Sequence, residues 1–72
     1  MDKISLTEKQ RDIYNFVLDH FRRTGVTPVY KDIADHFNVS KANIAKHLMA
    51  IERRGWIRRS NGMKNGLVIL EE

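Results

Sequence analysis

Two short amphipathic segments, separated by only about three residues, constrain the fold of this 72-residue chain more than any other feature. The first segment covers residues 29–37 and is followed by Asn38, a residue that tolerates the left-handed conformation at a helix end. The second covers residues 40–54, with Ser40 as its N-cap and Gly55 after its end. Because so short a linker forces two helices to cross steeply, we expect a tight helical corner.

The helix over 40–54 has two distinct faces. Ile44, Leu48 and Ile51 fall within about 60° of one another at 100° per residue, and they mark the buried side. The other side carries small, polar and basic residues: Ala42, Asn43, Lys46, Met49, Ala50 and Arg53. For the helix over 29–37, Thr27-Pro28 is a start signal, whereas a start at Val29 gives it a poor cap.

A third helix is predicted ahead of this corner, over residues 7–24. Thr7 and Gln10 have the spacing of a capping box, and Gly25 ends the helix. Its apolar stripe is formed by Ile13, Phe16, Val17 and Phe21.

The pattern changes from helical to extended after Gly55. Residues 56–59 and 67–70 are predicted strands, and the Gly- and Asn-rich segment 60–66 joins them into a hairpin over 56–70. Trp56 is expected to anchor this hairpin on the core, although base stacking is an alternative. We therefore predict one α+β domain over 1–72, a three-helix winged helix-turn-helix in which the two-stranded hairpin is the wing.

The net charge of +4 is unevenly distributed along the chain. Six basic and six acidic residues cancel over 1–37, whereas residues 38–70 hold seven basic residues against the single acid Glu52. A basic half-domain suits a polyanion, with double-stranded DNA as the first candidate, and the alternative is an ordinary solvated surface.

Several classes of function lack support in the sequence. There is no cysteine, and His20, His36 and His47 lie on separate segments without a ligand partner at metal-site spacing. The serines lie at caps and in a loop, with no sign of a buried base. No apolar run is long enough to span a membrane, and residues 1–7 lack the apolar core of a secretory signal. We expect a cytoplasmic, non-enzymatic protein without cofactor, metal or small-molecule ligand.

A recognition helix needs small or polar residues near its N-terminus, so that its backbone can approach the edges of the bases. The candidate contacts on this helix are Ser40, Lys41, Ala42, Asn43, Ala45 and Lys46. Asn43 suits an adenine edge, Lys46 suits guanine acceptors, and Ala42 can touch a thymine methyl. Each of them taken alone could equally be a plain solvent-facing residue.

The wing adds basic residues that suit phosphates or the minor groove. Lys64 lies at its tip, and one of Arg58 and Arg59 should point away from the core because strand side chains alternate. The alternative role of the two arginines is to protect an edge strand from aggregation.

A distributed pattern of residues runs through the chain: Leu6-Thr7-x-x-Gln10-x-x-Ile13-x-x-Phe16, Gly25-x-x-Pro28, Asp32-Ile33-Ala34, Ser40 and His47-Leu48-x-x-Ile51-Glu52-x-x-Gly55-x-Ile57-x-Arg59. This pattern, from about Leu6 to Leu70, resembles the N-terminal DNA-binding domain of the LexA repressor family. The resemblance implies a bacterial or phage-encoded repressor of transcription that binds operator DNA. It carries the recognition contacts over to Ser40, Ala42, Asn43, Ala45 and Lys46, with the wing tip near Asn61 to Asn65.

The chain departs from the family at informative positions. Members often have Gly where Asn38 stands and Thr or Ser where Val29 stands, and segment 42–46 matches no familiar version of the recognition helix, so no operator sequence is implied. Members continue into a second domain that dimerises and cleaves its own linker. Residues for that domain are not among these 72, so we do not expect self-cleavage.

Two functions remain open at this point. The first is a sequence-specific regulator, for which a homodimer on two half-sites would supply tight binding. The second is a winged-helix module for protein contacts or for phage or mobile-element DNA processing, since a fold does not fix a function.

Overall fold

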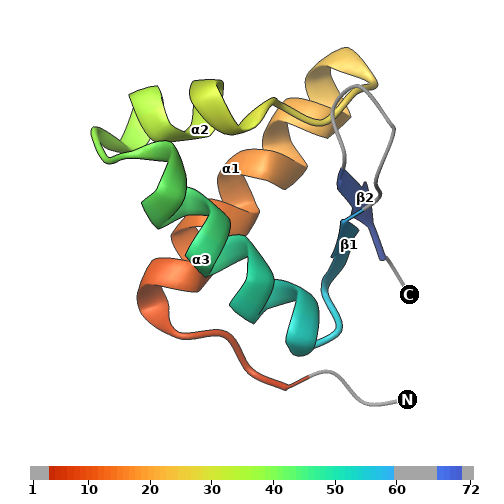
Figure 1. Ribbon diagram of the computed structural model, residues 1–72. Helices are drawn as coiled ribbons and strands as arrows, with labels where there is room; N and C mark the ends of the chain where they lie inside the picture. Colours follow the sequence, from red (N-terminus) through yellow and green to blue (C-terminus); the bar gives the residue numbers. More distant parts are fainter. Residues whose placement is uncertain (1–3, 60–66, 71–72) are drawn as a thin grey trace.

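The computed structural model describes residues 4–59 and 67–70, and all structural statements below refer to these residues. The described elements are α1 (Glu8–Thr24), α2 (Tyr30–Phe37), α3 (Lys41–Arg53), β1 (Ile57–Arg59) and β2 (Leu67–Ile69). In Figure 1, α3 crosses in front of α1, α2 lies across one end of both, and the strands stand beside the helices. The predicted α+β winged helix-turn-helix architecture is confirmed.

Helix α1 begins with the predicted capping box. The Thr7 hydroxyl accepts the Gln10 backbone N–H at 3.2 Å, and the Gln10 side-chain oxygen accepts the Thr7 N–H at 3.0 Å. Two otherwise unpaired donors of the first turn are thereby satisfied. At the other end, Gly25 adopts φ 86°, a left-handed conformation that favours glycine, and its N–H reaches the Phe21 carbonyl.

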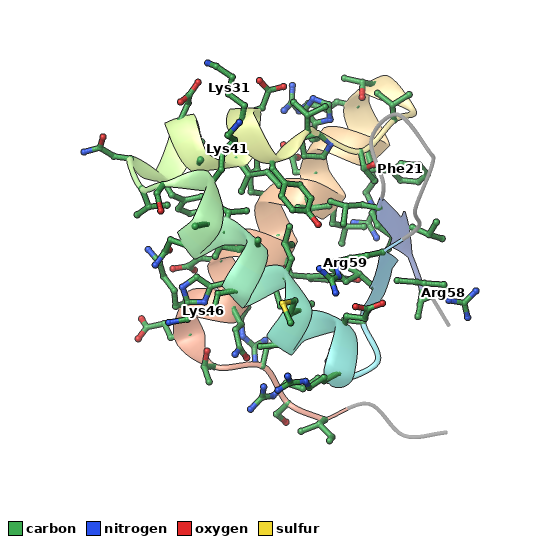
Figure 2. The ribbon with its side chains drawn as sticks, in the orientation of Figure 1. Phe21, Lys31, Lys41, Lys46, Arg58 and Arg59 are labelled. Atoms are coloured by element: carbon green, nitrogen blue, oxygen red, sulfur yellow. The ribbon has the colours of Figure 1, made fainter. Side chains whose placement is uncertain are left out.

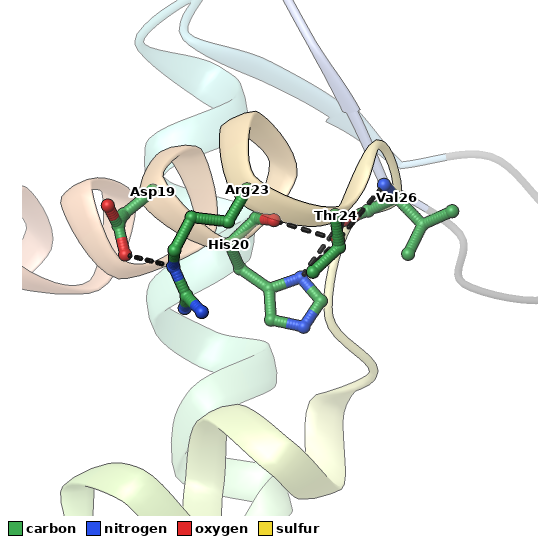
Figure 3. Close-up of polar contacts among 5 residues, drawn as sticks. All are labelled: Asp19, His20, Arg23, Thr24 and Val26. Atoms are coloured by element: carbon green, nitrogen blue, oxygen red, sulfur yellow. Dashed lines mark hydrogen bonds and ion pairs between the residues drawn. The ribbon is translucent and has the colours of Figure 1, made fainter.

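A polar cluster closes the turn after α1 (Figure 3). The Thr24 hydroxyl lies 2.8 Å from the His20 carbonyl oxygen and also accepts the Val26 N–H at 3.2 Å. His20 Nδ1 lies 2.9 Å from the Val26 carbonyl oxygen, so Nδ1 carries the proton, because a carbonyl can only accept. These hydrogen bonds fix the direction in which the backbone leaves α1 towards α2.

The corner between α2 and α3 is set by its caps. Helix α2 starts at Tyr30 with Val29 as an N-cap that makes no side-chain hydrogen bond, which is the poorer of the two starts considered. Asn38 ends α2 at φ 58° and ψ 47°, as expected for a left-handed cap. Ser40 then caps α3, its hydroxyl accepting the Asn43 N–H at 3.0 Å. One left-handed residue and one capping serine therefore define the turn.

The core lies between the three helices and the base of the wing. Ile13, Ile33, Ile44, Leu48 and Ile51 are completely inaccessible to solvent. The remaining core residues lie just before α1, within α1 and α2, and at the start of each strand: Leu6, Tyr14, Val17, Ala34, Ile57 and Leu67. Since every helix and both strands contribute, β1 and β2 belong to the same folded unit as the helices.

The two strands pair in antiparallel register with Ile57 opposite Ile69 and Arg59 opposite Leu67. Ile57 and Leu67 face inward and are buried. The Leu67 carbonyl also accepts a hydrogen bond from the Thr27 hydroxyl at 3.2 Å, and this threonine is itself buried. The wing is thus joined to the loop between α1 and α2 as well as to α3.

The segment before α1 clasps the junction between α3 and β1. The Ile4 N–H donates to the Arg54 carbonyl at 3.1 Å, and the Ile4 carbonyl accepts from Trp56 Nε1 at 2.7 Å. The Trp56 ring meets Tyr14 edge to face, with ring centroids 5.3 Å apart. The half-buried Trp56 therefore packs on the core beneath the wing, as expected.

Candidate nucleic-acid interface

One side of α3 forms an exposed ridge opposite its buried stripe. Ala42, Lys46, Met49 and Arg53 recur at helical spacing and are all solvent-exposed, and we call these four residues the α3 face. The ridge runs along a helix of 13 residues, about 20 Å long. Because the opposite side is completely buried, the orientation of this face is fixed by the core.

The start of α3 adds two further exposed residues. Ser40 and Lys41 precede the α3 face, and Figure 2 shows Lys41 at the beginning of the helix and Lys46 about halfway along it. The Ser40 hydroxyl is already engaged as the acceptor for the Asn43 N–H. It keeps its own proton for a further acceptor, because a hydroxyl is both donor and acceptor.

Two of the predicted contact residues lie on the flanks of α3 and not on the ridge. Asn43 and Ala45 are half-buried. The Asn43 side-chain oxygen is buried and has no hydrogen-bond partner among the described residues. A buried carbonyl oxygen without a partner is unfavourable, so the amide gains by turning towards a donor.

The two wing arginines take different directions (Figure 2). Both are exposed, but Arg58 extends away from the body of the protein, whereas Arg59 turns towards α3. Arg59 Nε lies 2.9 Å from a carboxylate oxygen of Glu52 in the last turn of α3. The other wing residues expected to contact DNA, Asn61, Lys64 and Asn65, fall outside the described residues.

The local charges perturb three ionisable groups at this interface. Hydrogen bonds from the backbone and the side chain of Arg59 lower the pKa of Glu52, and the bond to Glu52 raises the pKa of Arg59. Burial, aided by the charges of Lys9 and Lys46, lowers the pKa of His47. At neutral pH Glu52 is therefore ionised and bound to the positively charged Arg59.

The predicted set of contact residues leaves out Met49 and Arg53. The helical spacing that selects Ala42 and Lys46 also places Met49 and Arg53 on the ridge, so the periodicity of the sequence could have identified them. The pairing of Glu52 with Arg59 was not predicted. It joins residues seven apart across a helix end and a glycine, where neither helical nor strand periodicity applies.

The described residues offer little for other chemistry. No group of three or more potential ligands among His, Cys, Asp and Glu gathers there to hold a metal ion. None of the described helices is both long enough and apolar enough to cross a membrane.

Known proteins match this chain over most of its length. The family model "LexA DNA binding domain" matches residues 3–66. "LexA repressor 2" of Geobacter sulfurreducens is 36% identical over 66 residues, which cover 90% of this chain and 32% of that protein. The LexA repressor of Glaesserella parasuis is 36% identical over 73 residues, covering 100% of this chain and 35% of its own length. The chain thus spans about a third of the length of these relatives.

Proposed function

Since this chain belongs to the LexA DNA-binding domain family, we propose that it is a sequence-specific, double-stranded DNA-binding repressor of transcription. In this proposal α3 lies in the major groove and the wing lies along the backbone or in the minor groove. The observation that carries it is the α3 face, a ridge of small, basic and apolar side chains held outward by a buried stripe.

The dimensions and the chemistry of α3 suit the major groove. The groove is about 12 Å wide and admits a helix of about 10–12 Å diameter, provided that the side chains facing its floor are small. Ala42 meets this requirement at the exposed start of the helix, and Lys46 stands one turn further on. We assign Lys46 to guanine acceptors and Ala42 to close approach or to a thymine methyl.

The remaining residues of the helix have supporting roles in this proposal. Asn43 reads an adenine edge after its amide turns outward, and this turn frees the unpaired oxygen from its buried position. Ser40 and Lys41 bind phosphates at the helix start, where the partial positive charge of the helix dipole favours an anion. Ala45 lies beside the groove wall.

The wing supplies affinity more than sequence information. Arg59 forms an ion pair with Glu52 of α3, and we assign it to the DNA backbone. Asn61, Lys64 and Asn65 are assigned to the same role from their positions in the sequence alone. Contacts to phosphates make binding depend on salt but add little preference between sequences.

A single domain of this size offers few contacts to bases. We therefore propose that two copies bind a pair of half-sites and that operator occupancy blocks transcription. The protein then acts at the chromosome or at a phage genome within the bacterial cell.

Selection of bound DNA from a random pool, at low and at high salt, tests the proposal. A regulator enriches one motif, and the logarithm of its affinity falls linearly with the logarithm of the salt concentration. Recovery of sequences without a shared motif would reject sequence-specific repression. It would favour the alternative of a module for protein contacts or DNA processing.

Single substitutions then test the assigned roles on the selected site. Lys46→Ala and Asn43→Ala should each cost about 1–3 kcal/mol on the best site and relax the preference at one base pair. Arg22→Ala serves as the control, because it removes another exposed charge, from α1. If Lys46→Ala weakened selected and random DNA by the same factor, Lys46 would be a phosphate contact instead.

A further inference from the structure

The joint between α3 and β1 is held by Glu52, whose carboxylate binds Arg59 twice. One oxygen accepts the Arg59 backbone N–H at 3.1 Å, and the other accepts Nε–H at 2.9 Å. The first bond fixes the strand against the helix, and the second fixes the direction of the guanidinium. We call this arrangement the wing clamp, formed by Glu52 and Arg59.

The wing clamp leaves part of the Arg59 guanidinium available. A guanidinium has five N–H donors in a planar fork, and the bond to Glu52 uses the one on Nε. Besides Glu52, the Tyr30 side chain also forms a hydrogen bond with Arg59 and raises its pKa. The Arg59 side chain is 36% exposed, so part of the fork remains open to solvent. A planar fork held by its Nε edge is suited to bind a phosphate with its terminal nitrogens.

The same carboxylate poses a problem for a DNA-binding surface. Glu52 is the single acid between Asn38 and Leu70, and it stands in the last turn of the helix proposed to enter the groove. An acid there repels the phosphates, so removing it should strengthen binding by simple charge counting. Its two short bonds to Arg59 suggest the opposite outcome.

We propose that Glu52 is a positioning residue for DNA binding, which holds the Arg59 fork towards a backbone phosphate beside the groove occupied by α3. This inference rests on the proposed function and adds one residue to it. The carboxylate does not touch DNA; it replaces the several orientations of a free arginine by one, which lowers the entropy lost when the phosphate binds.

Glu52→Gln gives the decisive measurement on the selected DNA site. The glutamine keeps the size of the side chain but loses the negative charge, and its one acceptor oxygen can serve only one of the two Arg59 donors. We expect binding to weaken about threefold to tenfold, the range for losing one hydrogen bond, although an acid has been removed. Stronger binding by Glu52→Gln would overturn the inference, because repulsion would then dominate.

Asp35→Asn is the matched control. Asp35 is also an acid in an ion pair, at 2.8 Å from Lys31 on α2; it is more exposed than Glu52 and lies outside the assigned interface. Its removal should leave DNA affinity unchanged or slightly higher. If Asp35→Asn weakened binding as much as Glu52→Gln does, positioning of Arg59 would be rejected.

The Arg59→Ala background separates positioning from a purely structural role. Arg59→Ala should lower the slope of log affinity against log salt by about 0.9, the value for one lost phosphate contact. In that background Glu52→Gln should strengthen binding, because only repulsion by the carboxylate remains. Continued weakening there would show that Glu52 acts through the fold and would refute the inference.

Arg59→Lys provides a second route if Glu52→Gln does not fold. Lysine keeps the charge but lacks the fork, so it should bind the selected DNA several-fold more weakly than the parent protein. Affinity equal to that of the parent protein would overturn the inference. The proposed function fails separately, when the parent protein itself enriches no motif.

Discussion

The corner of α2 and α3 and the base of the wing are held by different forces. In the corner, Ile33, Ile44 and Leu48 are completely buried, and the polar bonds serve mainly as caps. At the wing, each strand contributes one buried side chain, Ile57 or Leu67. Polar bonds from Thr27 and Glu52 complete the attachment.

The difference shows that a small domain can use one kind of interaction for stability and another to set the orientation of an attached element. Apolar packing is nondirectional and contributes roughly in proportion to the buried area, so it stabilises the corner strongly. Hydrogen bonds contribute less in net terms but impose distance and direction. We infer that packing places α3, whereas polar bonds set the angle of the wing.

The largest expected effect comes from Ile44→Ala in the corner. Deleting a fully buried isoleucine side chain costs about 2–5 kcal/mol, which can exceed the whole stability of a domain of this size. Urea unfolding followed by circular dichroism measures this loss. Val68→Ala, on the exposed face of β2, is the control and should change stability by less than about 0.5 kcal/mol. Equal losses of stability in Ile44→Ala and Val68→Ala would contradict the proposed contrast between the corner and the wing.

Thr27→Val tests the polar attachment of the wing. The substitution keeps the shape of the side chain but leaves the buried Leu67 carbonyl without its side-chain donor, at a cost of about 1–3 kcal/mol. Amide hydrogen exchange should become faster in β1 and β2 before it changes in α3. Uniform acceleration through the whole domain would mean that the wing and the corner unfold as one unit.

Ser40→Ala removes the cap at the corner. The loss of its bond to the Asn43 N–H should cost about 0.5–2 kcal/mol in thermal or urea unfolding. Ser40→Asn supplies another capping side chain and should recover most of the loss. If the asparagine variant were as unstable as the alanine variant, the serine would have a role other than capping.

The wing clamp predicts that the stability of the folded domain decreases at acidic pH. The pKa of Glu52 is lowered in the folded protein by its bonds to Arg59, so its contribution is complete above the ordinary glutamate pKa. That contribution is lost as the pH falls through the lowered value. The difference in melting temperature between the parent protein and Glu52→Gln should therefore disappear in acid. A difference independent of pH would exclude the carboxylate as its cause.

The smallest expected effect is a pH dependence of stability caused by His47. Its pKa is lowered, first by burial and then by Lys9 and Lys46, so the neutral ring is favoured in the folded protein. Its contribution to stability is complete above the ordinary histidine pKa and decreases as the pH falls from there to the lowered value. A thermal unfolding series from neutral to mildly acidic pH should show this decrease in the parent protein and less of it in His47→Gln.

The helices could be predicted because their signals are local. The pair Thr7 and Gln10, the left-handed Asn38 and the capping Ser40 each act within a few residues, and all three are found as expected. The buried stripe of α3 follows from helical periodicity alone. For the same reason, the fold class could be predicted from the order of the segments.

The details of the interface depend on contacts that periodicity does not describe. Asn43 was placed on the open side of α3, yet the packing around its flank buries its oxygen. Strand alternation indicates that Arg58 and Arg59 differ in direction but does not say which one meets Glu52. Those outcomes require the angle between α3 and β1, which arises only when the whole core has assembled.

The bonds of Ile4 to Arg54 and Trp56 affect how the domain forms during synthesis. The residues that Ile4 binds are translated some fifty positions later, so α1 and α2 are synthesised long before Ile4 can clasp the junction between α3 and β1. The apolar stripes of those helices remain exposed to solvent until Ile44, Leu48 and Ile57 emerge from the ribosome. A pause in translation after α1 and α2 have left the ribosome, but before Ile44 and Leu48 have done so, would therefore expose the chain to aggregation.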